Sequence, residues 1–381
     1  MESLLNQFYQ RLPARAAAAD DYLHLLNDRE IEHVRRSQRQ VMLAAALLSV
    51  LGFLAYYLPI YRYSHLFPSF NLTIPLIGTA FRFAWGELLW CVLLTSVELY
   101  LLTLLNIFGV HEIAVATGFI TSATKLEKGE AILQIGLEKK TTEVSQYGID
   151  PFQGLNKWLL FLFNFALRLK GWFANQVMRF LVRLLLGRYA VRALLDFSGM
   201  PIYMAINAYS VYAVMRKARV IIIGQAVISL LIQRLPQRSL SAEEKELLYD
   251  TLQYIAISKR DFHHNHYLLT KELLEFFQVP GEKYHLLPDD YPEKLKQAPA
   301  AIAALCQLII LLGFILDGHI SWRERLKLQK LNQLGVLRES YSDLKRYARD
   351  FLNGAGVDGW SVAYLSAVEA FDQPVKSIEE A

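Results

Sequence analysis

Residues 41–60 read VMLAAALLSVLGFLAYYLPI, a run of about 20 residues without a charge. That is the length at which an α-helix crosses the hydrocarbon core of a bilayer. Arg35, Arg36 and Arg39 precede this run, and a cluster of tyrosines closes it, from Tyr56 to Tyr63. Cytoplasmic flanks of spans are rich in Lys and Arg, and membrane interfaces are rich in Tyr and Trp. The stretch therefore predicts a membrane span whose N-terminal side lies in the cytoplasm.

The composition of the 381-residue chain agrees with a protein that is partly embedded in a membrane. Hydrophobic residues make up 54% of the chain and charged residues 20%, compared with about 45–50% and about 25% in ordinary soluble proteins. This balance excludes an intrinsically disordered or collagen-like chain. Only two cysteines are present, Cys91 and Cys306, and neither belongs to a metal or redox motif, so a disulfide scaffold is excluded as well.

A second apolar run, from about residue 83 to residue 108, predicts a span that returns the chain to the cytoplasm. A short external loop with Pro68 and Pro75 joins the two spans. Glu98 lies near the middle of the second run. A carboxylate inside a bilayer costs about 2.5–3.5 kcal/mol on insertion and often marks a functional site, so Glu98 is a candidate intramembrane functional residue. The alternative is that Glu98 is protonated or bonds to a polar partner within the helical bundle.

The region from residue 155 to residue 235 combines apolar runs with positive charge. Residues 155–219 contain ten Lys or Arg and one Asp. Polar and basic residues at spacings of three and four in its first part predict a long helix with one cationic stripe, which suits the plane of a membrane surface. The arginines of this helix, which we expect to bind anionic lipids, are Arg168, Arg179, Arg183, Arg188 and Arg192. The alternative is a third span at this place.

Gly199 and Pro201 are expected to end that helix. Two shorter apolar runs follow, residues 200–215 and residues 220–235, with basic residues between them. They predict a half-membrane hairpin, two short spans, or two helices on the membrane surface. The chain therefore has two spans or four, and its C-terminus is cytoplasmic in either case. Because the basic residues lie among Leu, Phe and Trp, we expect an anionic lipid surface as partner and no nucleic acid.

From residue 236 onward the sequence predicts a soluble helical domain. Ser241 and Glu244 form a capping box that begins its first helix. A weak internal repeat relates two copies, each of which contains an apolar helix, a short polar loop and a second apolar helix; Leu248 of the first copy aligns with Leu305 of the second. The loop of the second copy reads DGHISWRE at residues 317–324. Its glycine predicts a tight turn, and its Ser and Glu predict another capping box.

With this loop, residues 240–372 or so resemble the TerB-like (tellurite-resistance B-like) family of bacterial proteins, whose helices are joined by an acidic D-G-x-I-S-x-x-E loop. The resemblance implies an all-helical fold and an envelope or stress-related sensing role. It also implies that Asp317 and Glu324 bind a divalent metal. The first copy lacks the acidic start of the loop, and calcium needs about six to eight oxygen ligands. A structural role as turn and helix cap is therefore the alternative for the two carboxylates.

Three histidines, His263, His264 and His266, lie in the equivalent loop of the first copy. Imidazole nitrogens bind zinc, but neighbouring histidines on a loop diverge and no cysteine lies nearby in the sequence. We therefore expect a solvated polar loop here. Apart from a divalent metal, no cofactor is expected.

Taken together, these features predict an all-α protein with two membrane spans, or four, and a cytoplasmic TerB-like helical bundle at its C-terminal end. The expected regions are a cytoplasmic juxtamembrane helix (1–40), a transmembrane hairpin (41–108), a cytoplasmic helical linker (109–154), a basic interfacial or embedded region (155–235) and the soluble TerB-like domain (236–381).

The motifs of common enzyme classes are absent from the sequence: it has no Walker A loop, no dinucleotide-binding glycine pattern, no G-x-S-x-G and no H-E-x-x-H. The leading hypothesis is a non-enzymatic protein of the inner (cytoplasmic) membrane that presents the TerB-like domain to a cytoplasmic protein partner or to a second copy of the chain. The alternative is a subunit of a transporter or channel with four spans, in which Glu98 lines the path. A lipid-acting enzyme at the interface is a third hypothesis, which rests on the basic helix alone.

Overall fold

The structure is a computed structural model that describes residues 2–14, 26–74, 79–83, 85–120, 124–136, 147, 149, 192–259, 263–281 and 285–369. Within these residues the chain is helical apart from one two-stranded hairpin. The elements of the first part are α1 (Glu2–Arg11), α2 (Asp28–Arg62), the 3-10 helix η1 (Ser64–Leu66), β1 (Phe70–Ile74), β2 (Thr79–Phe83), α3 (Trp85–Ala116), α4 (Gly129–Gly136) and α6 (Arg192–Arg234). The elements of the C-terminal bundle are α7 (Ala242–Lys259), α8 (His264–Phe276), α9 (Tyr291–Gln297), α10 (Ala300–Ile315), α11 (Trp322–Gln333), α12 (Tyr341–Asn353) and α13 (Asp358–Glu369).

Two helices of the described chain, α2 and α3, are long and apolar enough to cross a membrane. The predicted span at residues 41–60 lies inside α2, and nearly all of the predicted span at 83–108 lies inside α3. α2 begins well before the apolar run, at Asp28, because Asn27 and Glu30 form a capping box. The side chain of each accepts the backbone N–H of the other, both at 2.9 Å.

A β-hairpin occupies the connection between these two helices, where we expect only a loop. β1 and β2 are antiparallel, with Phe70 opposite Phe83 and Ile74 opposite Thr79. The alternation of apolar and polar residues in Phe70–Ile74, FNLTI, is typical of a strand. This short alternation is the local signal for the hairpin.

α6 is one continuous helix of 43 residues, with Pro201 inside it. The predicted helix end at Gly199 and Pro201 is therefore wrong, and so is the predicted separation of residues 200–215 from residues 220–235. A proline removes one backbone hydrogen bond, but neighbouring helices can hold such a helix together. The basic residues between the two apolar runs do not interrupt the helix, because Lys and Arg are good helix formers.

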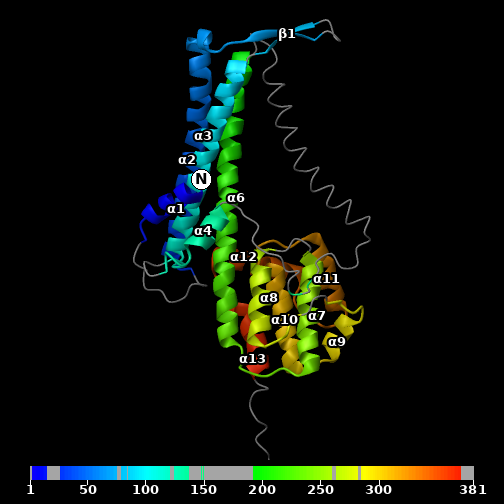
Figure 1. The fold of residues 1–381 in the computed structure, drawn as a ribbon. Helices are drawn as coiled ribbons and strands as arrows, with labels where there is room; N and C mark the ends of the chain where they lie inside the picture. The colour runs from blue at the N-terminus through cyan, green and yellow to red at the C-terminus, as the bar shows by residue number, and fades with distance from the viewer. Residues whose placement is uncertain are drawn as a thin grey trace, which may run out of the picture.

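α2, α3 and α6 pack side by side as a three-helix bundle (Figure 1). α2 and α3 are antiparallel, and the Trp90 indole N–H donates to the Ala55 carbonyl at 3.1 Å. α3 and α6 run in the same direction: Glu98 contacts Asn207 near the middle. Further along both helices, Met215 packs on Gly109, where an added Cβ would lie 3.0 Å from the Met215 sulfur. α6 therefore begins at the end of the bundle that carries the hairpin.

The middle and the last part of α6 belong to two different hydrophobic cores. Its middle, from Val211 to Ile222, packs with α1, α3, α4 and the N-terminal half of α2. Its last part, from Val220 to Leu235, packs in the core of the C-terminal bundle, together with Leu26 and Ile149. The core of the bundle thus extends back into α6 beyond the boundary expected at residue 236.

The expected repeat appears in the C-terminal bundle as two helix pairs, α7 with α8 and α10 with α11. The alignment of Leu248 with Leu305 also places Phe277, the C-cap of α8, on Leu334, the C-cap of α11. The N-cap His263 falls just before the N-cap Ser321 in the same alignment, because α8 has 13 residues and α11 has 12. The residue after each C-cap has a positive φ, Gln278 in the first pair and Gly335 in the second, so the two pairs end in the same way.

Candidate functional site

A buried lysine brings together the two carboxylates that the sequence singles out. The Lys259 ammonium, at the end of α7, donates to both carboxylate oxygens of Asp317 at 2.9 Å and also contacts Glu324 Oε1. It donates as well to two backbone carbonyls, those of Phe314 at 2.9 Å and His319 at 3.0 Å. The side chains of Lys259 and Glu324 are only 2% and 1% exposed. One cation is thus surrounded by five oxygen atoms.

The loop after α10 positions these oxygens by local rules. Gly318 has a φ of +67°, which favours glycine, and lets the chain reverse after Asp317. Asp317 Oδ1 accepts the His319 N–H at 3.0 Å. Ser321 and Glu324 then cap α11: Ser321 Oγ accepts the Glu324 N–H, and Glu324 Oε2 accepts the Ser321 N–H at 2.6 Å. The predicted capping box is confirmed, and it leaves the other oxygen of Glu324 to Lys259.

The charges of the cluster explain the opposite pKa shifts of its two acids. Burial alone raises the pKa of both carboxyls, but the Lys259 ammonium and the hydrogen bonds to Asp317 hold the pKa of Asp317 below its usual range. Burial outweighs the same ammonium at Glu324 and leaves its pKa raised. One ammonium cannot fully neutralise two buried carboxylates. Of the two carboxyls, Asp317 is therefore the one whose charged form the cluster favours.

Asp317 and Glu324 come together, as the metal prediction requires, but around an ammonium group. A divalent cation between them would have to displace Lys259 from its five oxygens. Among the described residues, no group of three or more His, Cys, Asp or Glu side chains could hold a metal ion. The residues present fit an internal cation, and they do not fit a divalent metal while Lys259 lies there.

The histidines of the equivalent loop are used in capping and packing. The His263 ring accepts the N–H of Asn265 at 3.3 Å and begins α8. His266 is fully buried: its Nδ1 accepts the His263 N–H at 3.2 Å, and its Nε2 lies 2.7 Å from the Gly313 carbonyl. Because an amide only donates and a carbonyl only accepts, His266 is neutral with its proton on Nε2. Burial lowers the pKa of His266 to about 3 and that of His263 to about 4.

Asn265 joins this loop to α6. Its Nδ2 donates to the carbonyls of Val220 at 2.9 Å and Leu316 at 2.7 Å, and the residue is completely buried. Gly224 permits this approach, because an added Cβ would lie 2.0 Å from Asn265 Nδ2. The loops at this end of the bundle are therefore fixed directly to the long helix.

The intramembrane candidate Glu98 meets polar groups of the other two long helices. Asn207 of α6 donates through Nδ2 to Glu98 Oε1 at 2.7 Å and to the Ser49 hydroxyl of α2 at 2.8 Å. Ser49 and Asn207 are buried, and Glu98 is half-buried. Each long helix thus contributes one polar side chain at the same level. A polar partner within the bundle is what the alternative interpretation of Glu98 expects.

Of the arginines expected at the membrane surface, Arg168, Arg179, Arg183 and Arg188 lie outside the described residues, as does most of the predicted interfacial helix. Arg192 is the first residue of α6, at the end of the three-helix bundle that carries the hairpin.

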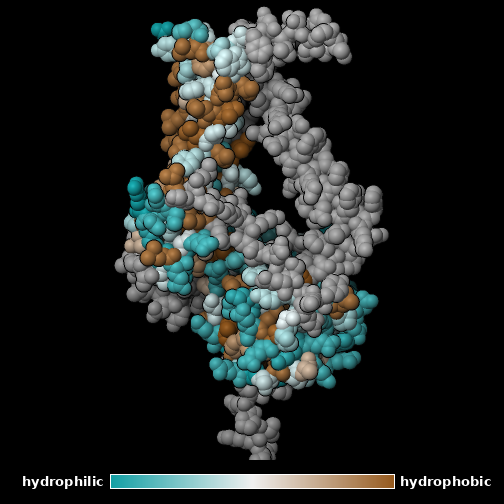
Figure 2. All heavy atoms as spheres, viewed as in Figure 1, coloured by the Kyte–Doolittle hydropathy of each residue, from teal (hydrophilic) through white to brown (hydrophobic). Residues whose placement is uncertain are grey.

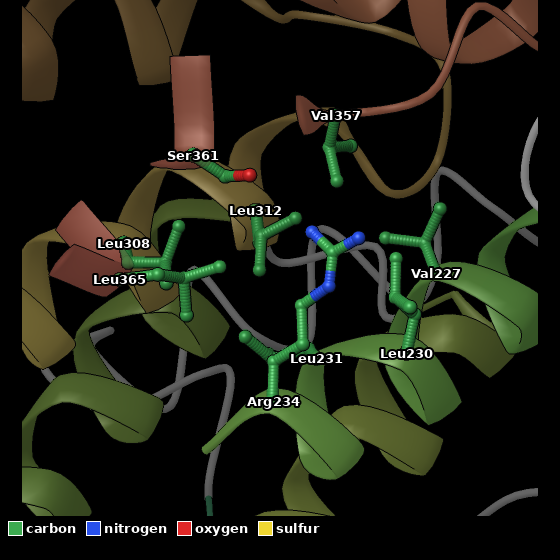
Figure 3. Close-up of a pocket in the computed structure, with 9 residues that line it drawn as sticks. All are labelled: Val227, Leu230, Leu231, Arg234, Leu308, Leu312, Val357, Ser361 and Leu365. Atoms are coloured by element: carbon green, nitrogen blue, oxygen red, sulfur yellow. The ribbon is translucent and has the colours of Figure 1, made fainter. Parts of the chain in front are cut away.

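A small cleft lies where α6 meets α10 and α13 (Figure 3). Arg234 reaches across it from α6 and pairs with Asp358, at 2.6 Å, at the start of α13. Most of its walls are apolar, including Leu308 and Leu365. Its enclosed space of about 10 Å³ has room for about one water molecule. The cleft is therefore a packing joint rather than a substrate pocket, since ligand pockets measure about 300–1,000 Å³.

Sequence reasoning missed Lys259, Asn207 and Asn265. Lys259 precedes the N-cap His263 by the same spacing at which Asp317 precedes the N-cap Ser321, so the two charged residues match when counted from the N-caps, one position away from the Leu248–Leu305 alignment. Opposite charges at these two positions of the repeat are a signal that could have predicted the ion pair. Asn207 lies far along the chain from Glu98, and no local pattern links them.

Lys259→Met tests the buried cluster, because it keeps the apolar stem and removes the charge. We expect a loss of about 3–5 kcal/mol in the free energy of unfolding, as for other broken buried ion pairs, which corresponds to a fall in Tm of roughly 10 °C. The buried Cys306 reports unfolding of the C-terminal bundle through its reaction with a maleimide dye, measured on the full chain in detergent with Cys91→Ser.

Two comparisons make this result specific. Lys271→Met removes an exposed pair with Glu275 at 3.9 Å and should change the free energy of unfolding by no more than about 0.5 kcal/mol. The triple variant Lys259→Met, Asp317→Asn, Glu324→Gln should recover much of the loss, because no unpaired charge remains. Equal effects of Lys259→Met and Lys271→Met would contradict the assigned role of Lys259.

The neutral histidines predict a loss of stability in mild acid. Their folded pKa values of about 3 and 4 lie below the unfolded value of about 6.5, so the unfolded chain binds more protons as the pH falls from about 6.5. The contribution of each histidine to the free energy of unfolding then falls by about 2 kcal/mol between pH 6.5 and pH 5. The stability contributed by the neutral rings is complete above pH 6.5 or so.

His266→Gln keeps one acceptor and one donor without titrating. Its Tm should depend less on pH than that of the unsubstituted chain between pH 7 and pH 5, whereas His319→Gln, at an exposed side chain, should leave the dependence unchanged. A pH profile that His266→Gln does not flatten would show that His266 is not the titrating group.

Comparison of the chain with models of protein families, with curated proteins and with solved structures gives no match. The TerB-like resemblance of the C-terminal bundle therefore stays a prediction.

Proposed function

We propose that the chain is a non-enzymatic integral membrane protein that holds its helical C-terminal bundle at the cytoplasmic face of the membrane, where the bundle binds a protein partner. In this proposal α2, α3 and the first half of α6 lie in the bilayer. The second half of α6 is the rigid connection to the bundle.

The observation that carries the proposal is the exposed apolar surface of the three-helix bundle. No residue in the most apolar segment of α3 is fully buried inside the protein. Large apolar side chains of α2 that are more than 60% exposed are Leu43, Leu47, Leu51 and Leu58. Those of α3 that are about half exposed or more include Leu88, Leu89, Val92, Leu93 and Leu99. Figure 2 shows a hydrophobic band over this part of the molecule, with hydrophilic residues beyond both ends. An apolar patch of this extent is typical of a membrane-embedded surface.

Charge supports the proposed orientation. The arginines before the apolar part of α2, and Lys125 and Lys128 after α3, lie at one end of the three-helix bundle. The C-terminal bundle lies at the same end (Figure 1). The positive-inside rule assigns this end to the cytoplasm, and the hairpin then lies outside.

The path of the chain favours four crossings over two. Ile149 belongs to the core of the C-terminal bundle, whereas α6 begins at the opposite end of the three-helix bundle. In a membrane that contains α2 and α3, Ile149 and Arg192 therefore lie on opposite sides. Together with α2, α3 and α6, this makes an even number of crossings and leaves the C-terminal bundle in the cytoplasm.

The proposed partner binding rests on the resemblance to the TerB-like family, which also suggests envelope or stress sensing. The continuity of α6 adds a physical route for such a role. A change in the packing of Asn207 in the membrane would tilt the same helix that Asn265 and Arg234 fix to the C-terminal bundle.

A transporter or channel subunit is the second candidate, and the polar contacts of Glu98 favour it. Ser49, Glu98 and Asn207 form a connected polar group across all three long helices, and intramembrane ionisable residues often mark ion paths. The same contacts also stabilise helix association without any transport. Ion flux through vesicles that contain the purified protein distinguishes the two roles.

Cysteine labelling in membrane vesicles of known orientation tests the proposed topology. We add one cysteine at an exposed position in a Cys91→Ser background that keeps the buried Cys306: Ser64→Cys beside the hairpin, Leu126→Cys after α3 or Ser239→Cys after α6. An impermeant maleimide should label the first in right-side-out vesicles, and the other two only in inside-out vesicles. Labelling of Ser64→Cys and Ser239→Cys from the same side would overturn the proposal.

A further inference from the structure

One end of the C-terminal bundle faces the membrane, and the contacts to α6 identify it. Asn265 places the start of α8 and the end of α10 beside Val220. Arg234, at the other end of this part of α6, pairs with Asp358 of α13. Since Val220 is much closer along α6 to Asn207, the loop that leads into α11 lies at the end nearest the membrane. In Figure 1, α11 accordingly lies in the half of the bundle toward α2 and α3, and α13 lies farther away.

The distance from this end to the bilayer is short. Arg216 and Lys217 are exposed and are the first charged residues after the apolar run at 200–215, so they mark the cytoplasmic boundary of the hydrocarbon. Val220 follows Arg216 by about one helical turn, which is about 6 Å along a helix. The headgroup layer on each side of a bilayer is about 5–8 Å thick. The end of the C-terminal bundle therefore reaches headgroup depth.

The first turns of α11 present an aromatic and basic surface at this end. Trp322 is 70% exposed and Leu326, one turn later, is 45% exposed. Arg323, Arg325 and Lys330 are exposed beside them. Because the acid of this helix, Glu324, is buried against Lys259, α11 exposes no negative charge. The internal ion pair thus leaves the surface of α11 purely cationic.

We propose that this face of α11 docks on the headgroups of anionic lipids at the cytoplasmic face of the membrane, with Trp322 as its interfacial anchor. The proposal rests on the membrane function proposed above. Trp is favoured at the membrane interface, and each Arg near an anionic surface contributes about 1 kcal/mol. α6 tethers the surface within reach of the bilayer, so even a weak attraction is effective. Docking would fix the orientation in which the bundle meets its partner.

Quenching of tryptophan fluorescence by brominated lipids tests both proposals on the full chain in vesicles. Each tryptophan is assigned from the signal lost in its Phe variant. Trp90, in α3, reports membrane insertion and Trp322 reports docking, whereas Trp360, which stacks on Tyr347 in the bundle, is the control. In vesicles of phosphatidylcholine and phosphatidylglycerol brominated near the headgroups, the signals of Trp90 and Trp322 should be quenched and that of Trp360 should not.

The double variant Arg323→Gln, Arg325→Gln tests the charge dependence. It should lower the equilibrium constant for docking about 30-fold, since two arginines contribute about 2 kcal/mol. Quenching of Trp322 should also fall when phosphatidylglycerol is left out. If Trp90 is quenched and Trp322 is not, α11 does not dock, although the chain is inserted. If Trp322 is quenched equally without anionic lipid, the lipid class is wrong. If Trp90 is not quenched, the proposed membrane function fails first.

Discussion

The continuity of α6 is the constraint on which the rest of the structure depends. One helix of 43 residues packs against α2 and α3 and, through its last part, in the core of the C-terminal bundle. Its sequence is rich in apolar residues because it packs on apolar helices along much of its length, first on α2 and α3 and then in the C-terminal bundle. Neither half of the protein can move far without bending this helix. A domain on a flexible linker would behave differently, since it could rotate freely relative to the three-helix bundle.

The buried cluster around Lys259 fixes the two helix pairs of the C-terminal bundle relative to each other. A buried ion pair adds little net stability compared with apolar packing, but the loss of one partner is costly. Lys259 belongs to the first copy and Asp317 to the second, so their pairing holds the two helix pairs together at one end of the bundle. Asn265 and Gly224 connect the same end to α6. The cluster and these contacts therefore fix the positions of the loops, of α6 and of the surface of α11 relative to one another.

Features encoded within a few residues could be predicted from the sequence. The apolar runs at 41–60 and 83–108 identify α2 and α3, because charge-free length is a local property. The capping boxes at Ser241 and Ser321 were predictable for the same reason. The continuity of α6 could not be predicted, because Pro201 and the basic residues after Met215 resemble helix ends when the helices beside them are unknown. The contacts of Asn207 with Glu98 and of Lys259 with Asp317 join residues far apart in the chain, and they depend on the tertiary fold.

The central claim is that α6 is unbroken from the three-helix bundle to the C-terminal bundle. Spin labels at Tyr209 and Gln233, both exposed, measure it directly on the full chain in lipid nanodiscs with Cys91→Ser. A continuous helix separates these two positions by about 36 Å along its axis, and the account predicts a narrow distance distribution near this value. A hairpin or a joint near residues 216–219 would give a much shorter or a broad distribution, and that result would contradict it.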